Sequence, residues 1–201
     1  MSRCECPKEA TSQSEHSPGL VKDEEPIVYA LVDPLTSKDG SVKDFSKSQL
    51  KSGTLSVCRA AHCTAVEAQE CILDPLLSKP DRKFEGAVWA SCESIRGIKL
   101  GSSEVGAFCV HDDALENYAA HAHLAFSSPE DEKLRNEREA ARGNLKEIFL
   151  NGSIFGSLSD CPFRSTIDMG APPSSLEPPI AVNSEEVPSI KLSGSADPEK
   201  T

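Results

Sequence analysis

The amino-acid sequence predicts an α+β domain, in which a small sheet has a few helices packed on it and long, disordered, acidic tails follow at both ends. Three observations support this class: short apolar runs typical of strands, two helix-capping patterns, and ends rich in proline and acidic residues. Because strand-like and helix-like segments are mixed along the chain, we expect the helices to pack on one side of the sheet. The pattern leaves the strand order open.

Five apolar runs predict the strands. Asp33 and Pro34 should close the first run, because proline cannot continue a paired strand. Trp89 lies in the third run, and we expect it to be buried in a central strand. The last run alternates between apolar and polar residues, which places His121 and His123 together on one face. The runs cover residues 27–32, 55–58, 86–92, 105–110 and 121–126.

A first helix is predicted after the second strand. Thr64 and Glu67 have the spacing of a capping box, in which each residue satisfies a backbone N–H group of the other. The helix should end before Pro75, which cannot continue it. Its buried side would hold Val66, Ile72 and Leu73.

A longer helix is predicted near the end of the domain. Ser128 can cap it, Pro129 suits its first position, and Asn151 with Gly152 gives a left-handed stop. Its apolar stripe consists of Leu134, Ala141, Leu145, Ile148 and Phe149. A second stripe is basic and consists of Arg135, Arg138, Arg142 and Lys146. Glutamates alternate with the basic stripe, which is typical of a solvated face with intrahelical ion pairs.

Charge and proline content divide the chain into three parts. Seven of the fourteen prolines lie in the final 51 residues, and both ends carry excess acid without apolar periodicity. Such segments cannot bury enough apolar surface to offset the entropy of ordering them. We therefore expect a disordered arm at 1–25, one folded domain at 26–152, and a disordered tail rich in proline, serine and glutamate at 153–201.

Composition argues against several classes of protein. No run of about 18 apolar residues exists, and the N-terminus lacks the apolar stretch of a secretory signal. The formal net charge of −11 argues against nucleic acid as the main partner, because nucleic-acid-binding domains are usually basic. We expect a cytoplasmic protein with reduced cysteines, no membrane partner and a protein partner.

Two short clusters could hold a metal ion. One is His62 with Cys63, and the other is His121 with His123, whose side chains lie about 7 Å apart along one strand face. A pair from each cluster would supply the nitrogen and sulfur ligands that zinc prefers. The alternative places both strand histidines on the polar face of a half-exposed strand. The lack of paired CxxC or HExxH motifs favours this alternative. No cofactor is therefore predicted, and zinc is the one cofactor that the two clusters leave open.

Catalytic signals are sparse, since the sequence has no GxSxG motif, phosphate-binding loop or GxGxxG motif. Cys63, just before a helix and beside His62, is the best-placed nucleophile. Arg59 would suit a phosphate-bearing substrate, because arginine pairs with phosphate oxygens bidentately. Asp112 or Asp113 is more simply a cap for the turn that follows. The candidate pocket consists of Arg59, His62, Cys63, Asn117, His121 and His123.

Four short motifs occur together within residues 27–126. They are a first strand ending at Pro34, a Leu-Ser-Val strand at 55–57 after a loop with Phe45, a Gly-x-x-Trp strand at 86–89, and an Asn-x-x-x-His-Ala segment at 117–122. This combination resembles small single-domain bacterial proteins of unassigned function. The resemblance implies a bacterial cytosolic α+β domain and brings no activity with it.

Two functions remain open. The first is a non-catalytic accessory or interaction protein of a bacterial cytosolic system, which would bind a partner through its surface or its acidic tails. The second is a small enzyme that acts on a phosphate-bearing or nucleotide substrate through an Arg/His pocket. The enzyme requires Arg59, His62, Asn117 and His121 to converge in one concave pocket, whereas the accessory protein does not.

Overall fold

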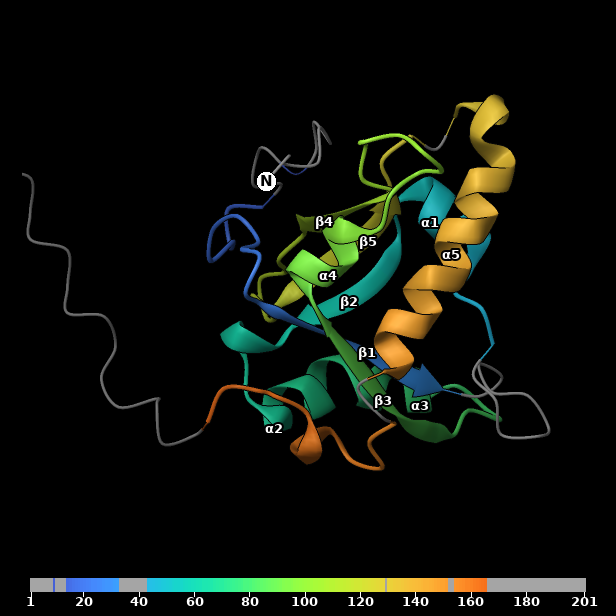
Figure 1. Cartoon of the computed structure of the whole chain (residues 1–201). Helices are drawn as coiled ribbons and strands as arrows, with labels where there is room; N and C mark the ends of the chain where they lie inside the picture. The colour runs from blue at the N-terminus through green and yellow to red at the C-terminus, as the bar shows by residue number, and fades with distance from the viewer. Residues whose placement is uncertain (1–8, 10–13, 33–42, 129, 152–153, 166–201) are drawn as a thin grey trace, which may run out of the picture. The chain divides into compact units, whose positions relative to one another are not determined.

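Antiparallel strands in the order β3-β1-β2-β5-β4 form a five-stranded sheet in the computed structural model (Figure 1). The structure describes residue 9 and residues 14–32, 43–128, 130–151 and 154–165. The strands are β1 (Pro26–Val32), β2 (Leu55–Arg59), β3 (Phe84–Ser91), β4 (Phe108–Asp112) and β5 (His121–Phe126). With the helices that pack on it, this sheet confirms the α+β class. The predicted end of the first strand, at Asp33 and Pro34, lies outside the described residues.

Helices of very different length connect and cover the strands. The α-helices are α1 (Lys47–Ser52), α2 (Ala65–Ala68), α3 (Asp74–Leu77), α4 (Cys92–Gly97) and α5 (Arg135–Leu150). A π-helical turn, η2 (Gln69–Leu73), joins α2 to α3. The 3-10 turns are η1 (Ala60–His62), η3 (Glu132–Leu134) and η4 (Leu158–Asp160). None of the described helices has the length and apolarity needed to cross a bilayer.

Both faces of the sheet are covered, so the expectation of helices on one side is wrong. We call the two sides the α5 face and the α2 face. On the α5 face, residues such as Leu31 and Leu124 pack in one apolar cluster with α1, α4 and α5. On the α2 face, residues such as Val28 and Cys58 pack in a second cluster with α2, η2 and η4. Successive strand residues point to opposite faces, and the strands bury apolar side chains on both.

Trp89 is half-buried on an edge strand, which corrects the prediction of a buried residue in a central strand. Within the sheet, β3 pairs with β1 alone. Beyond β3, Ala87 and Phe155 exchange two backbone hydrogen bonds of 2.9 Å, which cover the edge at one point. The apolar run around Trp89 is the same for an edge strand as for a central one, so the sequence pattern could not separate the two cases.

The helix after Thr64 begins as predicted and then continues through Pro75. The Thr64 hydroxyl accepts from the Glu67 N–H group at 3.2 Å, and the Glu67 carboxylate accepts from the Thr64 N–H group at 2.7 Å. The π-helical turn η2 is wider than an α-helical turn, so the α-helical hydrogen-bonding pattern begins again in α3. Pro75 therefore falls in the first turn of α3, where its missing N–H group costs nothing. Of the residues predicted to be buried, Leu73 is buried, Ile72 is half-buried and Val66 is 60% exposed.

The long helix α5 has the predicted apolar stripe but a different start. Ala141, Leu145 and Phe149 are buried, and Leu134 and Ile148 pack partly against them. The start is the η3 turn, whose cap is Asp131 rather than Ser128, because the Asp131 carboxylate accepts from the Lys133 N–H group. Pro129 and Gly152 lie outside the described residues.

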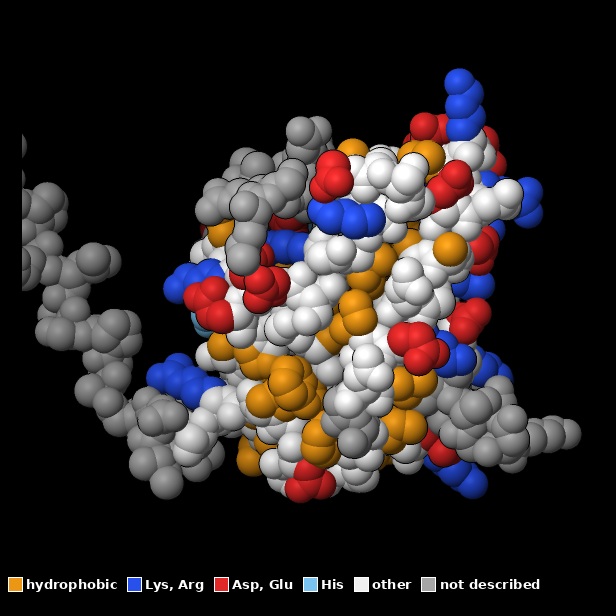
Figure 2. All heavy atoms as spheres, viewed as in Figure 1, with side chains coloured by type: hydrophobic (Ala, Val, Ile, Leu, Met, Phe, Trp, Pro, Cys, Tyr) orange, Lys and Arg blue, Asp and Glu red, His pale blue; other side chains and the backbone are white. Residues whose placement is uncertain are grey.

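Arg138 departs from the solvated face predicted for the basic stripe. Its guanidinium is buried, donates to the carbonyl oxygens of Ser128 and Asp131, and lies 5.9 Å from the centre of the Phe126 ring. Arg142 pairs with Glu139 and Asp44. Figure 2 shows acidic and basic side chains intermixed along α5. The stripe therefore anchors the helix and is partly neutralised by acidic neighbours.

Parts of both predicted tails belong to the fold. Val21 and Glu25 are buried, although residues 1–25 were expected to be a disordered arm. Leu158 and Cys161 are buried as well, beyond the predicted domain end at residue 152. Each segment docks through a few single residues, so neither shows the periodicity on which the boundary prediction relied. Residues 1–8, 10–13 and 166–201 lie outside the described residues.

Candidate metal centre

Asp113, His121 and His123 lie together on the α2 face, at the end of the sheet formed by β4 and β5. The two histidines are two residues apart on β5 and share a face, as the strand period predicts. Asp113 directly follows β4, and its N–H group donates to the His121 carbonyl oxygen at 3.3 Å. The β4–β5 pairing therefore brings the carboxylate to both imidazoles.

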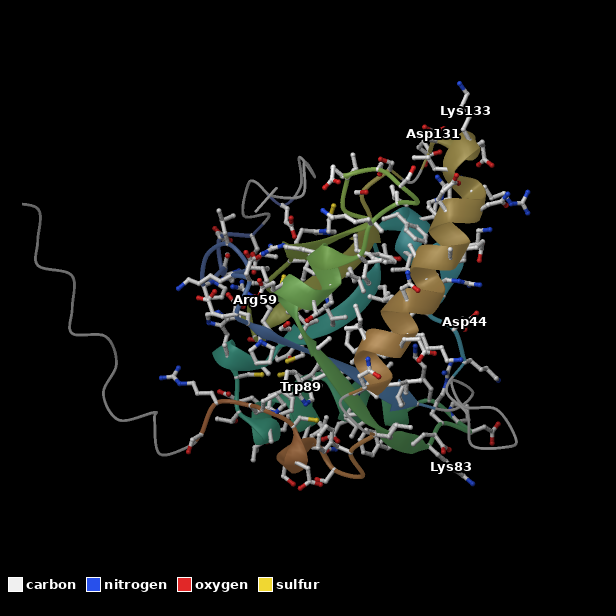
Figure 3. The ribbon with its side chains drawn as sticks, viewed as in Figure 1. Asp44, Arg59, Lys83, Trp89, Asp131 and Lys133 are labelled. Carbon is white, nitrogen blue, oxygen red and sulfur yellow. The ribbon has the colours of Figure 1, made fainter. Side chains whose placement is uncertain are left out.

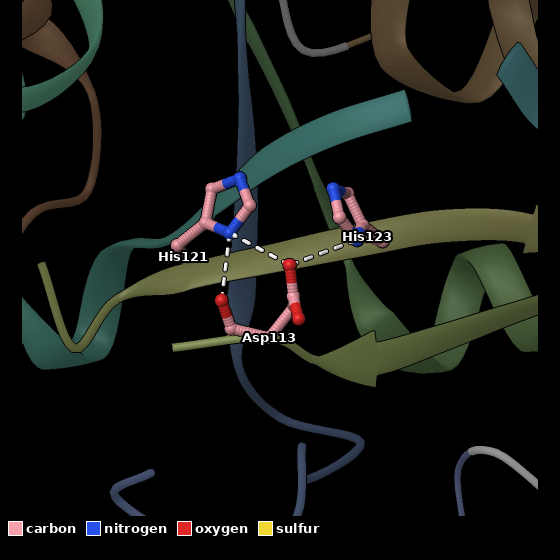
Figure 4. Close-up of side chains that lie close together, drawn as sticks. All are labelled: Asp113, His121 and His123. Carbon is pink, nitrogen blue, oxygen red and sulfur yellow. Dashed lines mark hydrogen bonds and ion pairs between the residues drawn. The ribbon is translucent and has the colours of Figure 1, made fainter. Parts of the chain in front are cut away.

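The three side chains are in direct contact (Figure 4). Oδ2 of Asp113 lies 3.4 Å from Nδ1 of His121 and 3.2 Å from Nδ1 of His123. The two imidazole rings are nearly perpendicular, with centroids 4.8 Å apart. Nδ1 of His121 also lies 2.8 Å from the Asp113 carbonyl oxygen. A carbonyl oxygen can only accept, so this Nδ1 carries a proton in the structure.

These distances fit the donor set of a zinc ion. One ligand atom from each residue lies within 4.8 Å of the other two. Ligand atoms of a tetrahedral zinc, with bonds of about 2.0–2.1 Å, are roughly 3.3–3.4 Å apart. Both nitrogen-to-oxygen distances match this separation. Two imidazoles and one carboxylate are a donor set that zinc accepts, and water or the Asp113 carbonyl oxygen could supply the fourth position.

We call Asp113, His121 and His123 the trio. The burial of the trio allows an ion to enter. The side chains of His121 and His123 are 14% and 17% exposed, and that of Asp113 is 36% exposed. His121 is slightly more enclosed than His123. The hydrogen-bond partner of the His121 ring is the Asp113 carbonyl oxygen.

A pocket of about 220 Å³ lies on the α2 face next to this centre. Its floor comes from β1 and β2, and its walls come from η2, α3 and the turn before β5. Apolar side chains dominate the lining, and the polar groups among them are Ser56, Cys58, Cys71, Tyr118 and His121. His121 therefore contributes to both the trio and the pocket.

Comparisons of this chain with protein-family models, with curated proteins and with solved structures find no match. The resemblance to small bacterial proteins therefore stays a prediction.

Arg59 is a structural residue and lies away from the pocket, beside the N-terminal segment (Figure 3). Its guanidinium is buried between two carboxylates, with Nε 2.8 Å from Glu25 and Nη1 2.8 Å from Asp112. It also donates to the carbonyl oxygens of Gly19 and Leu20. With its donors engaged in this way, Arg59 is poorly suited to receive a phosphate group.

Asp112 therefore serves as a buried ion-pair partner and Asp113 as a histidine partner, although one or the other was expected to cap the turn after β4. The sequence shows two adjacent acids and gives no sign of this division. Strand alternation explains why the two acids have different roles, because consecutive residues of a strand point to opposite faces.

Cys63 and His62 do not form a nucleophile and base. Nε2 of His62 lies 3.2 Å from Arg59 and 3.4 Å from Glu25. The Cys63 sulfur is buried 3.3 Å from the sulfur of Cys58. The Tyr118 hydroxyl donates to the Cys58 sulfur at 2.6 Å. Burial, followed by the contact with Cys63, raises the pKa of the Cys58 thiol well above its usual value, which keeps it protonated.

The six predicted site residues thus fall into four places. His121 and His123 join the trio, Arg59 and His62 belong to the buried ion-pair network, and Cys63 contacts Cys58. Asn117 is exposed, and its carbonyl oxygen accepts from the Cys71 thiol. Of the six, His121 alone lines the pocket in the described part of the chain.

Proposed function

We propose that this protein is a non-catalytic accessory module that binds one divalent cation, zinc in the first place, through Asp113, His121 and His123. The observation that supports this is the spacing of the donor atoms. Both imidazole nitrogens lie at a tetrahedral-zinc separation from the Asp113 carboxylate oxygen, and all three atoms lie within 4.8 Å of one another. This site contains two of the four residues of the metal site predicted from the sequence, His121 and His123. Asp113 replaces His62 and Cys63 as the partner of the strand histidines.

The alternative enzyme with an Arg/His pocket has less support. Its substrate would need the Arg59 guanidinium, which already pairs with Glu25 and Asp112 inside the protein. Extracting that guanidinium would leave two buried carboxylates without their counter-charge, at a cost of several kcal/mol. A metal ion at the trio requires no such rearrangement.

We expect chelator-treated protein to bind one equivalent of Zn²⁺ at neutral pH. His121→Ala, His123→Ala or Asp113→Ala should each weaken binding at least about a hundredfold, since even outer partners of metal ligands are worth about 10–100-fold. His16→Ala, which removes a histidine far along the chain, should retain wild-type affinity. Calorimetric titration measures both stoichiometry and affinity.

Cobalt distinguishes this site from the buried thiols. Co²⁺ bound by the trio should show ligand-field bands without thiolate-to-cobalt charge transfer, and Cys63→Ser should leave the spectrum unchanged. Charge-transfer bands, or binding that survives His123→Ala, would overturn the assignment. So would no binding at all, in which case the trio is an ion pair between Asp113 and its histidines.

A further inference from the structure

The pocket on the α2 face offers no fixed charge to a ligand. Among the residues that the structure describes, no lysine, arginine, aspartate or glutamate lines it. A charged molecule that entered would lose its hydration and gain no permanent counter-charge, which is strongly unfavourable. The lining therefore selects uncharged molecules.

The polar groups of the lining are already engaged within the protein or with water. The Tyr118 hydroxyl donates to the Cys58 sulfur at 2.6 Å. The Cys71 thiol donates to a backbone carbonyl oxygen, and Ser56 is exposed to solvent. His121 contacts the carboxylate of the trio through Nδ1. A polar substituent would compete with these existing contacts, so an apolar ligand suits the lining better.

The apolar walls of the pocket remain partly in water. Leu115 is 50% exposed, Pro75 is exposed, and Ile72 and Leu76 are only half-buried. All four residues line the pocket and also touch solvent, so they lie at its mouth. A ligand that covers them removes apolar surface from water, and this removal favours binding.

The volume of the pocket limits the size of the ligand. A cavity of about 150 Å³ holds benzene, so about 220 Å³ accommodates one aromatic ring with a short alkyl substituent. Ala30, on β1, contributes a small side chain to the floor. A larger side chain at this position would take up part of the space that the ring needs.

We propose that this pocket binds a small, uncharged, apolar molecule of about the size of ethylbenzene. Such a molecule would be a second ligand of the protein, beside the cation proposed above. None of the arguments for it involves a metal ion, so the pocket proposal and the zinc proposal stand or fall separately.

The test titrates the chelator-treated full chain with three probes. Ethylbenzene is the uncharged probe, benzylammonium is a cation with the same number of heavy atoms, and benzoate is an anion of similar size. Ethylbenzene should bind with a stoichiometry of one and at least about a hundredfold more tightly than either ion, because burial of an unpaired charge is so unfavourable. In methyl NMR spectra, the resonances of Val28, Ile72 and Leu76 should shift, since these side chains line the pocket.

Two variants and a control locate the ligand. Ala30→Leu fills the pocket and should weaken ethylbenzene binding at least about tenfold, because a well-filled site does not accept extra volume. Ala140→Leu makes the same change at an exposed position of α5 and should keep the wild-type affinity. Leu76→Ala enlarges the pocket, so it should favour butylbenzene over ethylbenzene more than the wild type does. A general loss of folding cannot produce such a change of preference.

Each contrary result refutes a definite part of the proposal. If the three methyl resonances do not shift up to the solubility limit of ethylbenzene, the pocket is not a binding site for such molecules. If benzoate or benzylammonium binds as tightly as ethylbenzene, the selection for uncharged ligands is wrong. If Ala30→Leu binds ethylbenzene like the wild type, the molecule binds elsewhere. Zinc is absent from all these titrations, so none of the results depends on the metal site.

Discussion

At the residue scale, Glu25 links the stability of the fold to pH. Burial alone would raise the pKa of its carboxyl, but hydrogen bonds from His62 and Arg59 outweigh burial and lower that pKa from 4.5 to about 2. The folded protein therefore binds this proton less readily than the unfolded chain does. Its contribution to stability is present above pH 4.5 and is lost as the pH falls toward 2.

We expect this carboxylate to contribute about 3 kcal/mol to the free energy of unfolding above pH 4.5, since one pKa unit corresponds to about 1.4 kcal/mol. Urea unfolding at pH 6 and at pH 3 measures the loss. Glu25→Gln should be less stable at pH 6 and lose less between the two values. Equal losses in the variant and the wild type would contradict this role.

The position of a single residue in the site could be predicted from the sequence only where local strand geometry determines that position. The period of a strand is enough to place His121 and His123 side by side. Asp113 was missed as their partner, because its position depends on the pairing of β4 with β5. Arg59 was misassigned to a substrate, since an arginine that pairs with buried carboxylates looks the same in sequence as one that binds phosphate.

At the element scale, the run of α2, η2 and α3 through Pro75 yields a prediction. Pro75→Ala should change the free energy of unfolding by less than about 1 kcal/mol, because a proline in a first helical turn is well tolerated. A proline in a helix interior costs about 3 kcal/mol, so its removal there would stabilise the protein by that amount. Thermal unfolding of the variant separates the two cases, and a large stabilisation would contradict the π-turn explanation.

The sequence predicted the elements that have strong local signals, but it did not predict how those elements are arranged in the sheet and on its two faces. The residues of β5 and the capping box at Thr64 match their predictions, because alternation and capping act within a few residues. The place of β3 at the edge was not predictable from its apolar run. Helices on both faces were missed for the same reason, since the strand order depends on contacts between distant segments.

At the scale of the whole molecule, the N-terminal segment completes the fold around the buried arginine. The carbonyl oxygens of Gly19 and Leu20 and the carboxylate of Glu25 accept from Arg59. The same segment reaches Arg96 in α4 through Asp23. Residues 14–25 thus supply partners to one strand, β2, and one helix, α4, although they form no regular element of their own.

A chain that begins at residue 26 should therefore be about 3–5 kcal/mol less stable than one that begins at Glu9. The shorter chain leaves Arg59 buried without Glu25, and breaking a buried ion pair costs about that much. Denaturant unfolding of the two purified chains measures the difference. Adding Arg59→Met to both chains serves as the control. It removes the buried charge, so truncation should then cost much less. If the chain from residue 26 is as stable as the longer one, or if Arg59→Met leaves the cost of truncation unchanged, the segment acts in some way other than by neutralising Arg59.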